Sequence, residues 1–255
     1  MLRIIYIVFR NLFHLYLIPL MRYVAAHPQK YPEQRRYQIV RKVSHLVTRA
    51  GHIHARYYGI ENIPASGGYI LCSNHQGKFD ALAIVNGHQQ PCSLVMDYER
   101  SQMYVVNEVM AMLQGKRLKR DDVRQAMSII LEMTDELKQG RKFIIFPEGG
   151  YLADKQNTLF PFKPGSFKSV LKSKSQIVPV ALIDTYKAFS TNSLRRVYVE
   201  VHYLPPITYE EIKDMKTPQI ANMVRMRIAD KISQVFDVPV EELLVDDLDP
   251  DVSLI

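Results

Sequence analysis

The sequence predicts an α/β fold with a mixed central sheet flanked by helices and an amino-terminal two-helix membrane-associating element. Short apolar, β-branched runs alternate with helical segments along the middle of the chain, which is typical of strand–helix–strand units. Residues 2–21 are strongly apolar, and a basic amphipathic segment follows them. We therefore expect an amino-terminal two-helix unit at residues 1–58, an α/β domain at 59–240 and an acidic tail at 241–255.

The apolar segment at residues 2–21 is interrupted by Arg3, Arg10 and His14. On a helix these three residues fall on one narrow stripe, within about 40° of each other. A spanning helix needs about 20 apolar residues with few charges, and Arg10 lies near the middle of this segment. We expect a helix that lies in the membrane interface, with Arg10 and His14 toward the headgroups. A true span, or a helix packed on the domain, is the alternative.

Residues 33–58 are predicted to form a second amphipathic helix. Apolar residues line one side, and Arg35, Arg36, Arg41 and Lys42 line the other. Charged side chains on such a helix usually face water. Beside an apolar first helix, these basic side chains can instead contact anionic lipid headgroups, and each basic residue near the surface then contributes about 1 kcal/mol to membrane binding.

The formal charge of +7 favours an anionic partner, which could be nucleic acid, anionic lipid or a phosphorylated substrate. The apolar amino terminus argues against nucleic acid, so we expect an anionic membrane surface. The expected location is the cytoplasmic face of the cell membrane, with a monotopic or membrane-anchored chain. Cys72 and Cys92 both lie in apolar runs, which indicates buried thiols in a reducing compartment.

The α/β domain is expected to alternate between strands and helices. The expected strands are 69–73, 92–96, 142–146, 177–183 and 196–204. The expected helices are 79–88, 100–113, 121–138, 165–173 and 217–236.

The most informative pair of residues follows the first of these strands, where Asp80 stands five positions after His75. A histidine can act as a general base, and a carboxylate on its other nitrogen fixes the tautomer and stabilises the imidazolium. Positions i and i+5 do not share a helix face, so we expect His75 on the turn before a helix and Asp80 in its first turn. The simpler interpretation is a capping aspartate and an ordinary surface histidine. The preceding strand favours a functional site, because ligand-binding and catalytic sites in α/β sheets lie at the ends of strands.

Four segments together resemble the glycerolipid acyltransferase family, whose best-known members are 1-acylglycerol-3-phosphate acyltransferases. Asn74-His75 with Asp80 resembles its first motif, and Gly115-Lys116-Arg117-Leu118-Lys119-Arg120 is similar to its second. Phe146-Pro147-Glu148-Gly149 resembles its third motif, and Ile177-Val178-Pro179-Val180 is similar to its fourth. Their order and spacing agree with the family over roughly residues 60 to 205.

The resemblance favours a two-helix membrane anchor at residues 1–58. It also implies direct attack of an acceptor hydroxyl on an acyl thioester. His75 would remove the hydroxyl proton, and Asp80 would orient His75. The residues implied to bind the acceptor are Asn74, Arg120, Glu148 and Gly149. The implied donor is an acyl-acyl-carrier-protein or acyl-CoA thioester, and no bound cofactor or metal is expected.

The sequence departs from the family after the third motif. The family usually has Thr or Ser and then Arg there, whereas this chain has Gly150 and Tyr151. Lys155, Lys163 or Lys168 could supply the missing positive charge.

The expected reaction is acylation of lysophosphatidic acid to phosphatidic acid. The alternatives are acylation of glycerol-3-phosphate or another lysophospholipid, and a catalytically silent lipid-binding protein of the same fold.

Overall fold

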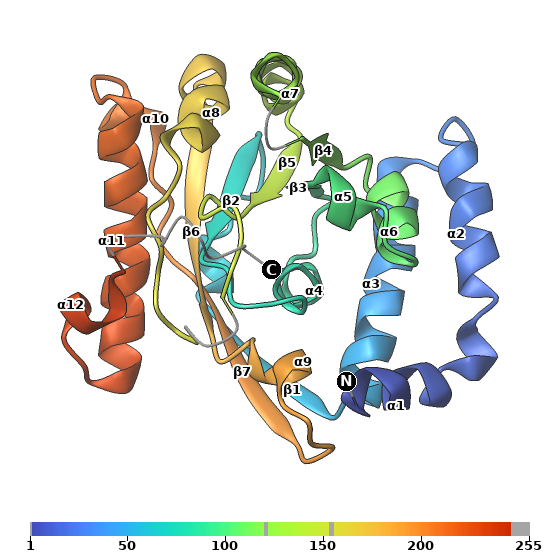
Figure 1. The fold of residues 1–255 in the computed structure, drawn as a ribbon. Helices are drawn as coiled ribbons and strands as arrows, with labels where there is room; N and C mark the ends of the chain where they lie inside the picture. The colour runs from blue at the N-terminus through green and yellow to red at the C-terminus, as the bar shows by residue number, and fades with distance from the viewer. Residues whose placement is uncertain (1, 120–121, 153–155, 246–255) are drawn as a thin grey trace.

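The structure, a computed structural model, describes residues 2–119, 122–152 and 156–245 (Figure 1). The strands in these ranges are β1 (Ile53–Tyr58), β2 (Tyr69–Ser73), β3 (Ser93–Asp97), β4 (Lys116–Leu118), β5 (Lys142–Ile145), β6 (Gln176–Ile183) and β7 (Val197–Tyr203). They form one sheet in the order β1-β7-β6-β2-β5-β3-β4. Strands β6 and β7 pair antiparallel, whereas every other neighbouring pair is parallel. The sheet is therefore mixed, as predicted.

Helices cover both faces of this sheet (Figure 1). The longer ones are α1 (Leu2–Arg10), α2 (Leu17–Ala26), α3 (Glu33–Ala50), α4 (Asp80–Gly87), α6 (Val106–Met112), α7 (Val123–Lys138), α8 (Lys168–Ser173) and α11 (Thr217–Phe236). Short helices are α5 (Tyr98–Ser101), α9 (Lys187–Ser190), α10 (Tyr209–Ile212) and α12 (Val240–Leu243). Side chains of α2, α3, α4 and α6 pack with one face, and those of α7, α8 and α11 pack with the other.

Strand β2 lies at the centre, and all five of its residues are buried. Tyr69 and Leu71 belong to one apolar core, whereas Ile70 and Cys72 belong to the other. This is why the strand is apolar on both sides rather than alternating. Because β2 runs parallel to both β5 and β6, the carboxyl ends of these three strands meet at one edge of the sheet.

The prediction of a helix over residues 33–58 was wrong in its last part. Helix α3 ends at Ala50, before Gly51, and residues 53–58 form β1 beside β7. The side chains of β1 alternate between less and more exposed positions, from Ile53 to Tyr58, with the period of a strand. Residues assigned to the anchor at 1–58 thus include the edge strand of the sheet.

Two smaller differences lie near β3. The helix expected at 100–113 is divided into α5 and α6, with Val105 at a φ of 70° between them. Lys116–Leu118 adds the edge strand β4, which was not predicted.

The apolar amino terminus is broken into α1, a 3-10 turn at Leu12–His14 and α2. In the described part of the chain, no single helix has the length and hydropathy to cross a membrane. Residues 2–10 and 12–26 reach that threshold only when taken together, across a 62° bend. Arg3 is buried and donates to the carbonyls of Gly51 and Arg195. Arg3 therefore does not share an outward-facing stripe with Arg10, which is exposed.

Of the acidic tail predicted at 241–255, the described part is short. It comprises the end of α12 and residues 244 and 245, which run beside Leu159. Residues 246–255 lie outside the described residues.

Candidate active site

His75 and Asp80 lie where β2 gives way to α4, and their side chains are in contact. Nδ1 of His75 is 2.7 Å from Oδ2 of Asp80. Asp80 is the first residue of α4, and His75 lies on the turn before it, as predicted from their spacing. Asp80 is fully buried, whereas the His75 side chain keeps 20% of its exposure. The histidine thus faces outward over a buried acid.

Oδ2 of Asp80 also accepts hydrogen bonds from the backbone amides of Gln76 and Gly77. The same carboxylate oxygen therefore stabilises the turn and orients the imidazole ring. A capping role and a role beside His75 are compatible.

The imidazole ring of His75 contacts two aromatic side chains. It stacks on Phe146 with ring centroids 4.4 Å apart and meets the edge of Tyr151 at 4.7 Å. Asp80 occupies Nδ1, and no described residue forms a hydrogen bond with Nε2. With Nδ1 engaged by Asp80, Nε2 is the ring nitrogen that can form a hydrogen bond with a molecule bound at this site. Tyr151, the residue in place of the family's arginine, therefore belongs to the site, a contact that the sequence analysis missed.

Glu148 joins the loop after β5 to the loop after β2. Its Oε1 accepts from the backbone amide of His75 at 2.8 Å, and its Oε2 accepts from that of Phe160 at 3.2 Å. The side chain is buried, and burial raises its pKa to about 8, although these two hydrogen bonds oppose the shift. In this geometry Glu148 positions the main chain around His75.

Asn74 is also engaged with the main chain. Its side-chain amide donates to the carbonyl of Leu182 at 3.0 Å and accepts from the amide of the same residue at 2.8 Å. Asn74 is fully buried, so it fixes the loop after β2 to strand β6.

A polar network that the sequence analysis did not identify extends this connection. The Gln76 side chain donates to Asn157 and to the carbonyl of Leu182, and it accepts from the amide and hydroxyl of Thr185. Its only sequence signal is its position directly after His75.

Of the remaining predicted site residues, some are described by the structure and others are not. Gly149 follows Glu148 with a φ of +79°, in the left-handed region. Arg120 and Lys155 lie outside the described residues. The second predicted motif is described only as far as Lys119, and its residues 116–118 form β4.

Both cysteines are buried and free, as predicted. Burial raises the pKa of the Cys72 thiol well above its usual value and that of Cys92 to about 12. A buried thiol with a raised pKa is a poor nucleophile.

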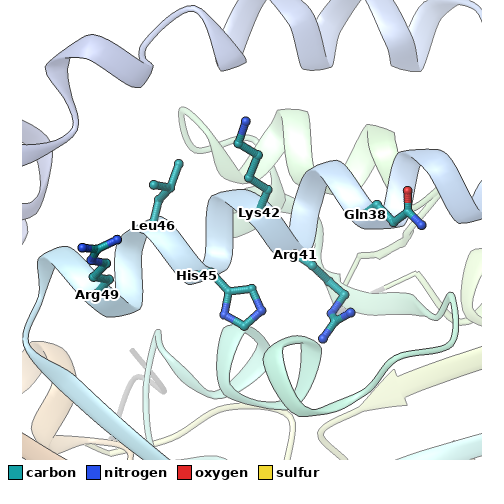
Figure 2. Close-up of a pocket in the computed structure, with 6 residues that line it drawn as sticks. All are labelled: Gln38, Arg41, Lys42, His45, Leu46 and Arg49. Atoms are coloured by element: carbon teal, nitrogen blue, oxygen red, sulfur yellow. The ribbon is translucent and has the colours of Figure 1, made fainter.

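A separate hollow with a volume of about 380 Å³ lies along α3 (Figure 2). Its lining residues are Gln38, Arg41, Lys42, His45, Leu46 and Arg49. In Figure 2, Lys42 and Leu46 point to one side of α3, and Arg41 and His45 point to the other, toward α4. None of the predicted site residues that the structure describes lines this hollow.

The chain is similar in sequence to known proteins. Residues 54–183 match the model of a protein family described as Acyltransferase. The 1-acyl-sn-glycerol-3-phosphate acyltransferase of Borreliella burgdorferi is 26% identical over 181 residues, which are 69% of this chain and 71% of that protein. The Saccharomyces cerevisiae protein of the same name is 27% identical over 182 residues, covering 69% of this chain and 59% of the yeast protein.

A solved structure shares the fold. The crystal structure of the 1-acyl-sn-glycerophosphate (LPA) acyltransferase PlsC from Thermotoga maritima aligns with a TM-score of 0.64 and 19% sequence identity. The alignment covers 88% of this chain and 98% of that one. The predicted fold class, a helix-flanked mixed α/β sheet preceded by helices, is thereby confirmed.

Proposed function

This chain belongs to the acyltransferase family, whose model it matches over residues 54–183, and from that premise we propose that it acylates lysophosphatidic acid. A fatty acyl group would pass from an acyl thioester to the free hydroxyl, giving phosphatidic acid. The observation that carries the proposal is the 2.7 Å contact between His75 and buried Asp80 at the carboxyl edge of the sheet. The names of the curated relatives support the choice of acceptor.

In the proposed reaction, Nε2 of His75 is the atom that accepts the proton. Nε2 takes the proton of the acceptor hydroxyl while the oxygen attacks the thioester carbonyl carbon. The tetrahedral intermediate collapses, the carbon–sulfur bond breaks, and the departing thiolate takes the proton from the imidazolium. Asp80 stabilises the imidazolium between these steps, because its carboxylate accepts from Nδ1. The donor can be an acyl-acyl-carrier-protein or acyl-CoA thioester.

The apolar surface of the amino-terminal helices supports action at a membrane. Side chains of α1 and the following turn face outward, among them Ile5, Phe9 and Phe13. Scattered exposed apolar residues are ordinary, but a contiguous set on one element marks a membrane or protein contact. Lys42 and Arg49, both exposed on the neighbouring helix α3, supply positive charge for anionic headgroups. We propose that the protein lies on the cytoplasmic face of the cell membrane, as a monotopic or membrane-anchored chain.

Thiol release tests the proposed reaction. Purified full-length protein is mixed with acyl-CoA or acyl-acyl-carrier-protein and with an acceptor panel of lysophosphatidate, glycerol-3-phosphate and other lysophospholipids. We expect release with lysophosphatidate and loss of it in His75→Ala. The matched control is His54→Ala, because His54 is exposed on β1.

The panel also separates the alternatives. If the protein prefers glycerol-3-phosphate or another lysophospholipid, that molecule is the acceptor instead of lysophosphatidate. This alternative is considered because Tyr151 stands where the family usually has arginine. Vesicle binding without thiol release from any acceptor would show a catalytically silent lipid-binding protein.

A further inference from the structure

Lys163 lies against the loop that carries Glu148. Its backbone amide donates to the carbonyl of Pro147 at 2.9 Å. The same loop is closed by a hydrogen bond from the amide of Gly149 to the carbonyl of Phe146 at 3.1 Å. The main chain of Lys163 is therefore attached to the loop one residue before Glu148, although the two segments are separate in sequence.

The side chain of Lys163 runs across the open face of Gly149. A Cβ atom placed on Gly149 would collide with Nζ and Cε of Lys163. The end of the lysine side chain therefore occupies the space that a side chain at position 149 would fill. The absence of a side chain there brings the ammonium group close to the loop backbone.

This loop is also the one that surrounds the proposed base. Glu148 accepts from the backbone amide of His75, and the ring of Tyr151 meets the ring of His75 at 4.7 Å. Residues on both sides of Gly149 therefore contact His75. A cation lying over Gly149 is therefore on the same loop as the two residues that contact His75.

The charge of Lys163 is not neutralised by a described acidic side chain. Within the described ranges, no carboxylate forms an ion pair with it. Glu148, on the same loop, is buried with both carboxyl oxygens directed at the backbone amides of His75 and Phe160, and burial raises its pKa to about 8. Lys163 is itself exposed. An exposed ammonium beside a loop without a compensating negative charge favours a bound anion.

The geometry points to Lys163 as the residue that binds the phosphate of the acceptor, in the role for which the family's arginine is missing at Tyr151. This inference rests on the proposed function and adds the specificity-determining group. Of the three lysines that could have compensated, Lys155 lies outside the described residues, and Lys168 begins α8 beyond the turn at Pro164–Phe167. A lysine contacts phosphate as a compact point charge with three donors, rather than through the bidentate fork of arginine.

Binding of a soluble probe tests the inference without turnover. We would titrate glycerol-3-phosphate, and glycerol as its uncharged counterpart, into the full-length protein by calorimetry. Lys163→Met should weaken glycerol-3-phosphate binding about tenfold or more, as expected for the loss of a charge-assisted contact. Lys163→Arg should retain most of it. Lys168→Met, a nearby exposed lysine, is the matched control and should bind like the unmodified protein.

Steady-state kinetics provide a second test of the role of Lys163. With lysophosphatidate as acceptor, Lys163→Met should raise KM about tenfold with a smaller change in kcat, and the Lys163→Arg variant should recover. Equal affinity for glycerol-3-phosphate in the Lys163→Met, Lys168→Met and unmodified proteins would overturn the inference. Equal affinity of the unmodified protein for glycerol and glycerol-3-phosphate would overturn it too. Absence of thiol release by the unmodified protein would instead reject the proposed function, and the calorimetric result on Lys163 would still stand.

Discussion

Oε1 of Glu148 accepts a hydrogen bond from the backbone amide of His75 at 2.8 Å, across 73 positions of sequence. The contact joins the ends of two parallel neighbours in the sheet, β2 and β5. It sets the position of the proposed base through the main chain, while Asp80 sets the orientation of its ring. Two acids thus act on one histidine in different ways.

The raised pKa of Glu148 predicts a pH dependence of stability. The folded protein keeps this proton up to about pH 8, whereas an unfolded chain loses it near the ordinary value of 4.5. The free energy of unfolding should therefore fall as pH rises between these values. His88 acts in the opposite sense at lower pH, because burial lowers its pKa from 6.5 to about 4.

Comparison with Glu148→Gln isolates the contribution of Glu148. The variant should show a shallower fall in unfolding free energy between about pH 5 and about pH 8. It should also be less stable at about pH 5 by roughly 1–3 kcal/mol, because its amide group faces one of two backbone N–H donors. Denaturant titration at both pH values measures this. An identical pH slope in the two proteins would contradict the assignment.

Asp80→Asn should separate orientation of the base from folding. The asparagine oxygen can replace Oδ2 and keep the hydrogen bonds from Gln76 and Gly77. It cannot stabilise an imidazolium as a carboxylate does, so kcat should fall roughly 10²–10⁴-fold. The melting temperature and acceptor binding should change little. If kcat stayed near that of the unmodified protein, Asp80 would be a capping residue alone.

Gly149→Ala should act through Lys163. Alanine at a φ of +79° is strained, and its Cβ would displace the lysine end. We expect a modest stability loss of roughly 1–2 kcal/mol together with a higher KM for lysophosphatidate. Because both changes remove the same ammonium contact, Gly149→Ala combined with Lys163→Met should raise KM no further than Lys163→Met alone. Additive effects on KM would show that Gly149 acts independently.

The parts of the site that could be predicted from the sequence are the local ones. His75 and Asp80 are close in the chain, and a strand, a turn and a helix start suffice to bring them together. The contacts of Glu148 and Asn74 could not be predicted from the sequence. Each depends on which backbone groups the folded loops present, and these come from residues 75, 160 and 182.

The missed strand β1 has a similar cause. Residues 53–58 continue an amphipathic pattern that a helix could also satisfy. Their partner is β7, where Ile53 pairs with Val197. A short segment with ambiguous periodicity is decided by such distant pairing. The buried position of Arg3 likewise depends on carbonyls of Gly51 and Arg195 that helical periodicity cannot reveal.

The contact between Arg22 and Glu108 is predicted to fasten α2 to α6. Nε of Arg22 donates to Oε1 of Glu108 at 2.7 Å, and Glu108 is buried while Arg22 is half-exposed. Arg22→Met would leave a buried carboxylate without this partner, at a cost of roughly 1–3 kcal/mol. Removing both charges with Arg22→Met and Glu108→Leu should recover part of that loss. Chemical denaturation of both variants measures the difference, and a double variant weaker than the single one would contradict it.

The amino-terminal helices should bind membranes through their exposed apolar side chains. Phe9 and Phe13 keep 70% and 94% of their exposure, so neither contributes much to folding. Burying a phenylalanine in a lipid interface is worth up to roughly 1.5–3 kcal/mol. The Phe9→Ser and Phe13→Ser double variant should therefore bind anionic phospholipid vesicles at least about tenfold more weakly. Its unfolding free energy should be unchanged.

Vesicle sedimentation measures this, with Val123→Ser as the matched control. Val123 is 78% exposed on α7, on the other side of the sheet from α2 and α3. Losing it should leave vesicle binding intact. Binding should also weaken with added salt, because basic residues of α3 contribute screened attraction. If the double phenylalanine variant sedimented with vesicles as well as the Val123→Ser protein, the apolar surface of α1 would not be the membrane contact.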